Sequence, residues 1–203
     1  MHNQHAVRLA GLLVVSWLVA PLALAATLDG LDRVAASAMG RFTGGYGDDL
    51  ALLVEPPEAS DADYTLIILA DAAGRGGSLG EIARFDNAAW GGVGDIYGNR
   101  PSVAFTQAGS LQLRSGNDAI GRNRWSETVT LVWRENTVLM AGYTYQERDT
   151  LVENSETRCD INLLTGASEV FDSQGTRRPN VGSRSLPFQQ WIDEGRPNLC
   201  ETR

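Results

Sequence analysis

Two alternating segments separated by two residues constrain the fold of this chain more than any other feature. In RWSETVTLVWR, residues 124–134, the apolar side chains take alternate positions, at Trp125, Val129, Leu131 and Trp133. After a turn candidate at Glu135 and Asn136, TVLMAGYTYQ alternates again, with Leu139, Ala141, Tyr143 and Tyr145 in phase. Because successive side chains of a strand point to opposite faces, this pattern predicts an antiparallel hairpin with one apolar face.

Further short segments extend the same prediction to the rest of the chain. The continuous apolar runs at 50–54 and 65–70 are typical of strands buried on both faces. SLQLR, CDINLLTG and ASEVFD add strands with turns between them. We therefore expect an all-β protein in which an antiparallel meander forms a sandwich or a partial propeller-like sheet. Residues 31–39 fit either a short N-terminal helix or an early strand, and residues 185–195 fit a short helix or coil.

Residues 1–25 predict a secretory signal peptide. Arg8 precedes an apolar run from Leu9 to Ala25, which contains Pro21 and closes on the small residues of Ala-Leu-Ala. An uncleaved membrane anchor is the alternative. No later stretch is long and apolar enough to span a bilayer. We therefore expect a periplasmic or secreted protein without stable membrane insertion.

The remaining chain divides into a β-rich domain at 26–172 and a C-terminal extension at 173–203. Its only cysteines are Cys159 and Cys200, and in an exported protein two cysteines most simply form one disulfide. The bridge would close a loop of about 40 residues, for which chain entropy gives a stabilisation of roughly 4 kcal/mol. We expect it to tie the extension to the domain.

Composition removes most kinds of catalysis. All 17 basic residues are arginine, and both histidines, His2 and His5, lie in the predicted signal peptide. Without histidine or lysine the chain has no Ser-His-Asp triad, Ser-Lys dyad or Schiff base, and a paired cysteine is no nucleophile. Zinc sites are equally disfavoured. What remains is carboxylate chemistry, such as glycoside hydrolysis by two acids, or the binding of hard cations. The formal net charge of −8 disfavours nucleic acid as a partner.

Several motifs carry a resemblance to known families. GRFTGGYGDDLALLVEPPE, followed by YTLIILADAAGRG, resembles a degenerate FG-GAP/VCBS repeat, within residues 26–86. The part at 87–172, with its RW strand, GYTY strand and closing DINLLTG, is similar to uncharacterised exported bacterial proteins that combine these motifs. The resemblance implies an all-β, often exported protein, and it brings no activity and no catalytic residues.

The glycine-rich loop before the first apolar run is a candidate calcium site. In calcium-binding repeats such a loop supplies carboxylates at alternate positions, but here only Asp48 and Asp49 remain. Calcium takes six to eight oxygen ligands, and adjacent residues of an extended segment point to opposite sides. We therefore expect no metal or other cofactor, and we expect the aspartates to cap the turn into the strand.

Two other groups of residues are candidates for ligand binding. The irregular segment GGVGDIYGNR contains Asp95, Tyr97 and Arg100 and could hold an anion, although no helix follows it as in a phosphate loop. Tyr143 and Tyr145 could stack on a sugar, as could Trp125 and Trp133, but aromatic residues at alternate strand positions also fit a core.

These observations favour a non-catalytic binding or interaction module of the cell envelope, with a protein or a glycan as its partner. The alternatives are a carboxylate-dependent glycoside hydrolase and an inhibitor of an envelope hydrolase. A deep cleft with two facing carboxylates would favour the enzyme, and an aromatic surface would favour binding.

Overall fold

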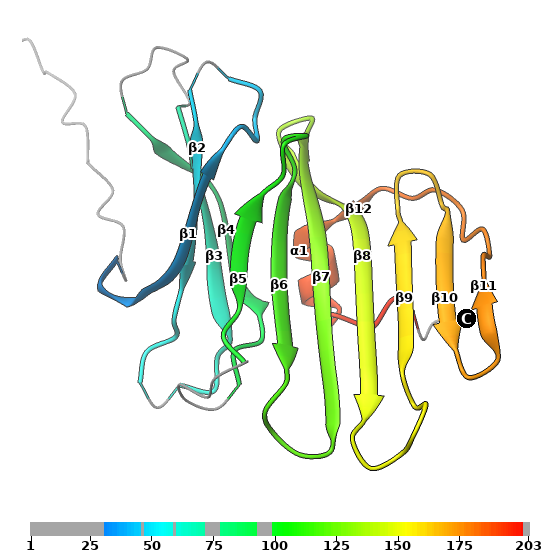
Figure 1. Ribbon diagram of the computed structural model, residues 1–203. Coiled ribbons are helices and arrows are strands. Elements are labelled where there is room, and N and C mark those ends of the chain that lie inside the picture. Colours follow the sequence, from blue (N-terminus) through cyan, green and yellow to red (C-terminus); the bar gives the residue numbers. More distant parts are fainter. Residues whose placement is uncertain (1–30, 46, 59, 72–77, 93–98, 201–203) are drawn as a thin grey trace, which may run out of the picture.

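The computed structural model describes residues 31–45, 47–58, 60–71, 78–92 and 99–200. It is all-β, with two antiparallel sheets and one short α-helix, as the sequence predicts (Figure 1). Asp95 and Tyr97 lie outside the described residues, as does the predicted signal peptide. Among the residues that the structure describes, no helix has both the length and the hydropathy needed to cross a membrane.

The first sheet has four strands in sequence order. They are β1 (Val34–Gly40), β2 (Asp49–Val54), β3 (Tyr64–Ala70) and β4 (Gly80–Ala89). A single 3₁₀ turn, η1 (Leu31–Arg33), precedes β1, so this segment is the early strand rather than a helix. Strands β2 and β3 are buried on both faces, as their apolar runs predict. Leu53 and Ile68 face the main core, whereas Leu52 and Ile67 belong to a separate apolar cluster.

The second sheet is a meander of seven strands, with a short eighth pairing at its side. In chain order these are β5 (Ser102–Phe105), β6 (Leu111–Asn117), β7 (Asn123–Arg134), β8 (Thr137–Asp149), β9 (Thr157–Asn162), β10 (Ser168–Asp172), β11 (Gly175–Arg177) and β12 (Leu186–Pro187). Strands β5 to β11 lie side by side in that order, and β12 pairs with the start of β8. The C-terminal extension therefore contributes strands to the sheet itself.

The β7–β8 hairpin confirms the predicted antiparallel pairing, but not every residue of β8 that was predicted to face the core does so. Glu135 and Asn136 both have positive φ, 51° and 58°, as a two-residue turn of type I′ requires. The register then shifts, because Thr130 pairs with Gly142 whereas Leu131 pairs with Met140. This bulge places Met140, rather than Leu139, in the core, and Tyr143 returns to the buried face.

One apolar core joins the two sheets and the helix. The helix α1 (Phe188–Asp193) lies behind β7 and β8 in Figure 1, and its Phe188 and Trp191 are fully buried. The Phe188 ring meets Phe85 of β4 edge-on, with ring centroids 4.9 Å apart. The helix thus links the C-terminal extension to the first sheet as well as to the second.

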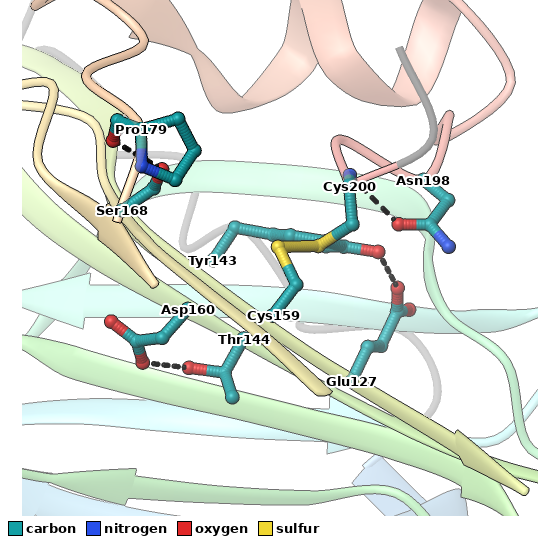
Figure 2. Close-up of a disulfide and its surroundings, with 9 residues drawn as sticks. All are labelled: Glu127, Tyr143, Thr144, Cys159, Asp160, Ser168, Pro179, Asn198 and Cys200. Carbon is teal, nitrogen blue, oxygen red and sulfur yellow. Dashed lines mark hydrogen bonds between the residues drawn. A yellow bond between two sulfur atoms is a disulfide. The ribbon is translucent and has the colours of Figure 1, made fainter. Parts of the chain in front are cut away.

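The predicted disulfide is present. Cys159 on β9 and Cys200 are bridged across 41 residues of sequence, with their Cα atoms 6.1 Å apart (Figure 2). Cys159 is 2% exposed. The bridge therefore attaches the segment after α1 to the buried face of the larger sheet.

Candidate functional site

The glycine-rich loop uses Asp49 as a structural acceptor. The Oδ2 atom of Asp49 accepts hydrogen bonds of 2.7 Å from the backbone N–H groups of Phe42 and Thr43, and the Thr43 hydroxyl also donates to this carboxylate. Asp49 is 2% exposed, whereas Asp48 is exposed. The loop's own donors thus occupy the carboxylate that a cation would need.

Calcium is accordingly expected to have no measurable effect on stability. A ligand that binds the folded state at a hundred times its dissociation constant would stabilise it by about 2.7 kcal/mol. We expect the melting temperature of chelator-treated protein to stay within about 1 °C when millimolar calcium is added, because Asp49 is already saturated. A rise of several degrees, lost on replacing Asp48 by asparagine, would contradict this assignment of the loop.

A small aromatic pocket, of about 240 Å³, is the strongest candidate for a binding site. Its walls come from the residue after β4, from β7 and β8, and from the segment after α1. They comprise Trp90, Trp125, Glu127, Tyr143, Tyr145, Gly195, Arg196 and Asn198. The pocket contains both predicted tyrosines, and it does not contain Arg100, which lines a different hollow.

The aromatic rings of the pocket form a continuous row. Trp90 lies 5.3 Å from Trp125, Trp125 lies 6.3 Å from Tyr145, and Tyr145 lies 6.4 Å from Tyr143, all measured between ring centroids. The last two pairs are nearly parallel, with interplanar angles of 19° and 5°. Trp90, Trp125 and Tyr145 are half-buried, whereas Tyr143 is 1% exposed. The rings of Trp90, Trp125 and Tyr145 are therefore held in place by their neighbours and still expose part of their surface to a ligand.

Trp90 is held in this row by close backbone packing. The next residue, Gly91, is buried against the ring of Tyr64, and a Cβ atom at that position would lie 2.0 Å from Tyr64 Cε2. A side chain there would displace either the ring or the chain after β4. Gly91 thus fixes where Trp90 leaves the first sheet to meet the second.

Glu127 places a buried carboxyl group at the pocket. Its Oε1 accepts a 2.8 Å hydrogen bond from the Ser115 hydroxyl. Figure 2 shows the second hydrogen bond, of 3.2 Å, which the Tyr143 hydroxyl donates to Oε2. Burial raises the pKa of Glu127 above its ordinary value, and these two hydrogen bonds and the charge of Arg196 only partly oppose that effect. Glu127 therefore holds a proton more readily than a carboxyl group in water.

The turn after α1 supplies the charged wall of the pocket. Gly195 and Arg196 both have positive φ, 82° and 54°, and the Arg196 N–H donates to the Trp191 carbonyl at 2.8 Å. A positive φ is unusual for a long side chain. The guanidinium of Arg196 forms an ion pair with Asp63, and burial raises the pKa of Asp63 in spite of this partner. Arg196 thus has an unfavourable backbone conformation at the point where its side chain lines the pocket.

Sequence reasoning identified part of this site and overlooked the rest. Trp125, Tyr143 and Tyr145 come together as an aromatic group, but Tyr143 is buried and acts through its hydroxyl. Glu127 was not predicted as a site residue. Its sequence position does contain a signal, since it is a charged residue at one of the alternate positions of β7 that are otherwise apolar. Trp90 and Arg196 lie in irregular segments, where no periodicity marks them.

Comparisons with protein-family models, curated proteins and solved structures found no match for this chain. The described residues contain no group of three or more histidine, cysteine, aspartate or glutamate side chains able to hold a metal ion. The functional argument therefore depends on the geometry of the site.

Proposed function

We propose that the protein is a non-catalytic binding module of the cell envelope and that its aromatic pocket binds a single sugar residue of a glycan. One observation carries this proposal: accessible aromatic rings occur in one pocket with a carboxyl group, a guanidinium and an amide. Rings stack on the apolar faces of sugars, and a few polar groups fix their hydroxyls. The signal-peptide pattern and the disulfide support a location in the envelope, because both fit export.

The size of the pocket favours a small, partly inserted ligand. At about 240 Å³ it is below the usual range of roughly 300–1,000 Å³ for pockets that enclose a whole ligand. One sugar ring at the end of a glycan fits that scale, and the remainder of the glycan would lie outside the pocket. A folded protein partner would instead need a larger continuous surface.

Glycoside hydrolysis is the second candidate, and Glu127 is the observation that favours it. A buried carboxyl group with a raised pKa has the character of a general acid. The reaction also needs a second carboxylate across the substrate. Among the described residues that line the pocket, Glu127 is the only acid, and nearby Asp63 is paired with Arg196. The described geometry thus supports binding better than hydrolysis.

Replacing Trp125 by alanine is expected to abolish most glycan binding. Trp125 contacts Trp90 and Tyr145, so its removal both deletes a stacking surface and loosens its neighbours. We expect the affinity for the best ligand found on an array of envelope glycans to fall by about tenfold or more. Phe171 is a matched control, since it is an aromatic residue that is 44% exposed and lies outside the pocket; replacing it by alanine should leave binding unchanged.

Two results would count against this proposal. The first is the absence of any glycan ligand for the unaltered protein, or equal losses in the Trp125 and Phe171 variants. The second is cleavage of the bound glycan, lost on replacing Glu127 by glutamine, which would establish the hydrolase instead.

A further inference from the structure

A second and larger hollow, of about 950 Å³, lies on the opposite face of the larger sheet and is lined by arginine. We call it the arginine hollow, after Arg100, Arg114, Arg124 and Arg148. Three strands, β6, β7 and β8, supply most of its surface, and Arg100 reaches it from the segment before β5. Figure 1 shows these strands from this face, with α1 behind them.

Strand register explains why the surface is hollow at this point. Gly116, Ser126 and Gln146 are paired across β6, β7 and β8, and two of these three residues have little or no side chain to fill the space. Arg114 precedes this row on β6, and the paired residues Arg124 and Arg148 lie beyond it on β7 and β8. Because alternate residues share a face, short side chains form a floor with long cationic side chains at both ends.

The charge of the hollow is opposite in sign to that of the chain. Four arginines line the hollow with two carboxylates, Asp118 and Glu147, and Arg100 also has Glu55 at 4.0 Å. The whole chain, in contrast, has a formal net charge of −8. Asp118 pairs with Arg148 at 3.2 Å, and both side chains are more than half exposed, so this pair contributes little. Positive potential is therefore concentrated in one place on an acidic protein.

Arg124 is the residue that most clearly lacks a partner. Its Nη1 atom is buried and makes no hydrogen bond. Arg114 likewise has no hydrogen bond or ion pair within the part of the chain that the structure describes. A buried charged donor without an acceptor is costly, so folded proteins rarely retain one without a reason. An anion bound in the hollow would supply the missing acceptor.

We propose that the arginine hollow is a binding site for a phosphoryl group that carries more than one negative charge. Guanidinium groups donate to such oxyanions in a fork, and several of them can surround its three oxygens. Ser102 and Ser126, which also line the hollow, add neutral hydroxyl donors. This proposal does not rest on the glycan site, because Arg114, Arg124 and Ser126 lie outside the aromatic pocket. Trp125 lines both sites.

Titration calorimetry with inorganic pyrophosphate tests the site directly. We expect saturable binding to the purified protein, weakened about tenfold or more by Arg124→Gln and by Arg114→Gln. Arg134→Gln is the matched control, since Arg134 is exposed at the far end of β7 and is outside the hollow. Its replacement should leave the affinity unchanged. Ser126→Leu, which fills the floor without changing the charge, should weaken binding as much as the loss of an arginine.

Thermal melting without ligand separates a binding role from a structural one. Because Arg124 has an unpaired buried donor, Arg124→Gln should keep or raise the melting temperature of the ligand-free protein while it removes binding. A lower melting temperature with unchanged affinity would show that Arg124 is structural and would overturn the proposal. Equal affinities in the Arg124, Arg114 and Arg134 variants would do the same.

The phosphoryl group could belong to a soluble molecule or to a lipid, and vesicles distinguish these sources. Phosphatidylcholine vesicles containing phosphatidic acid present the same group on a surface. Sedimentation of the protein with these vesicles, lost in Arg124→Gln, would assign a lipid headgroup. Binding of pyrophosphate without sedimentation would assign a soluble phosphate. Binding of neither probe would show that the hollow is not a phosphoryl site.

Discussion

Replacing Cys159 and Cys200 together by alanine is expected to lower the free energy of unfolding by about 4 kcal/mol. The bridge closes a loop of 41 residues, and chain entropy gives a value of that size for such a loop. Alanine is the appropriate replacement because Cys159 is buried, and a serine hydroxyl there would need a partner. Urea denaturation of the two proteins under the same oxidising conditions measures the difference.

The structural consequence is expected to be local to the segment after α1. Phe188 and Trp191 still anchor the helix in the core, so residues 194–200 should open before the helix does. Hydrogen exchange should therefore accelerate at the amides of Glu194 and Arg196, while the amides of β2 and β3 keep their protection. Equal stability with and without the bridge, or uniform exchange throughout the chain, would contradict this expectation.

Replacing Trp191 by alanine is expected to cost about 3–5 kcal/mol. Its side chain is fully buried and contacts the rings of Tyr143 and Phe188, with centroids 6.1 Å and 5.8 Å away. Its indole N–H also donates to the Pro197 carbonyl at 3.0 Å. The substitution leaves a cavity where α1 meets the sheet, and it also frees the segment that carries Arg196.

Two further variants show which part of Trp191 matters. Phenylalanine keeps most of the volume and loses the hydrogen bond, so we expect a cost of about 1–2 kcal/mol. Gln189→Ala changes the exposed side of the same helix and should stay within about 0.5 kcal/mol. If the midpoints of urea unfolding for Trp191→Ala and Gln189→Ala coincide, the helix is not a part of the core.

The strands could be predicted from the sequence because their signal is local. The alternation of β7 and the apolar runs of β2 and β3 reflect burial on one face or on two, and burial is what the structure shows. The bulge in β8 could not be predicted, since it is defined by pairing with β7, and the sequence of β8 alone continues to alternate past it. Tyr143 thus faces the core while Leu139 does not.

The candidate site was harder to predict because its parts are distant in the sequence. Arg196 and its partner Asp63 are 133 residues apart, and Trp90, directly after β4 of the first sheet, meets Trp125 of the second. Neither contact leaves a pattern in its own segment. The disulfide could be predicted for the opposite reason, because only two cysteines were available to form it.

The position of Gly195, Arg196 and Asn198 in the aromatic pocket has a consequence for the order in which the protein matures. These residues follow every described strand along the chain, and the bridge that attaches their segment to β9 forms only when Cys200 and Cys159 are oxidised together. Until then the pocket lacks its charged wall, although both sheets can already pair. We therefore expect the pocket to take its final shape only after the disulfide has formed, so that oxidation rather than strand pairing completes it.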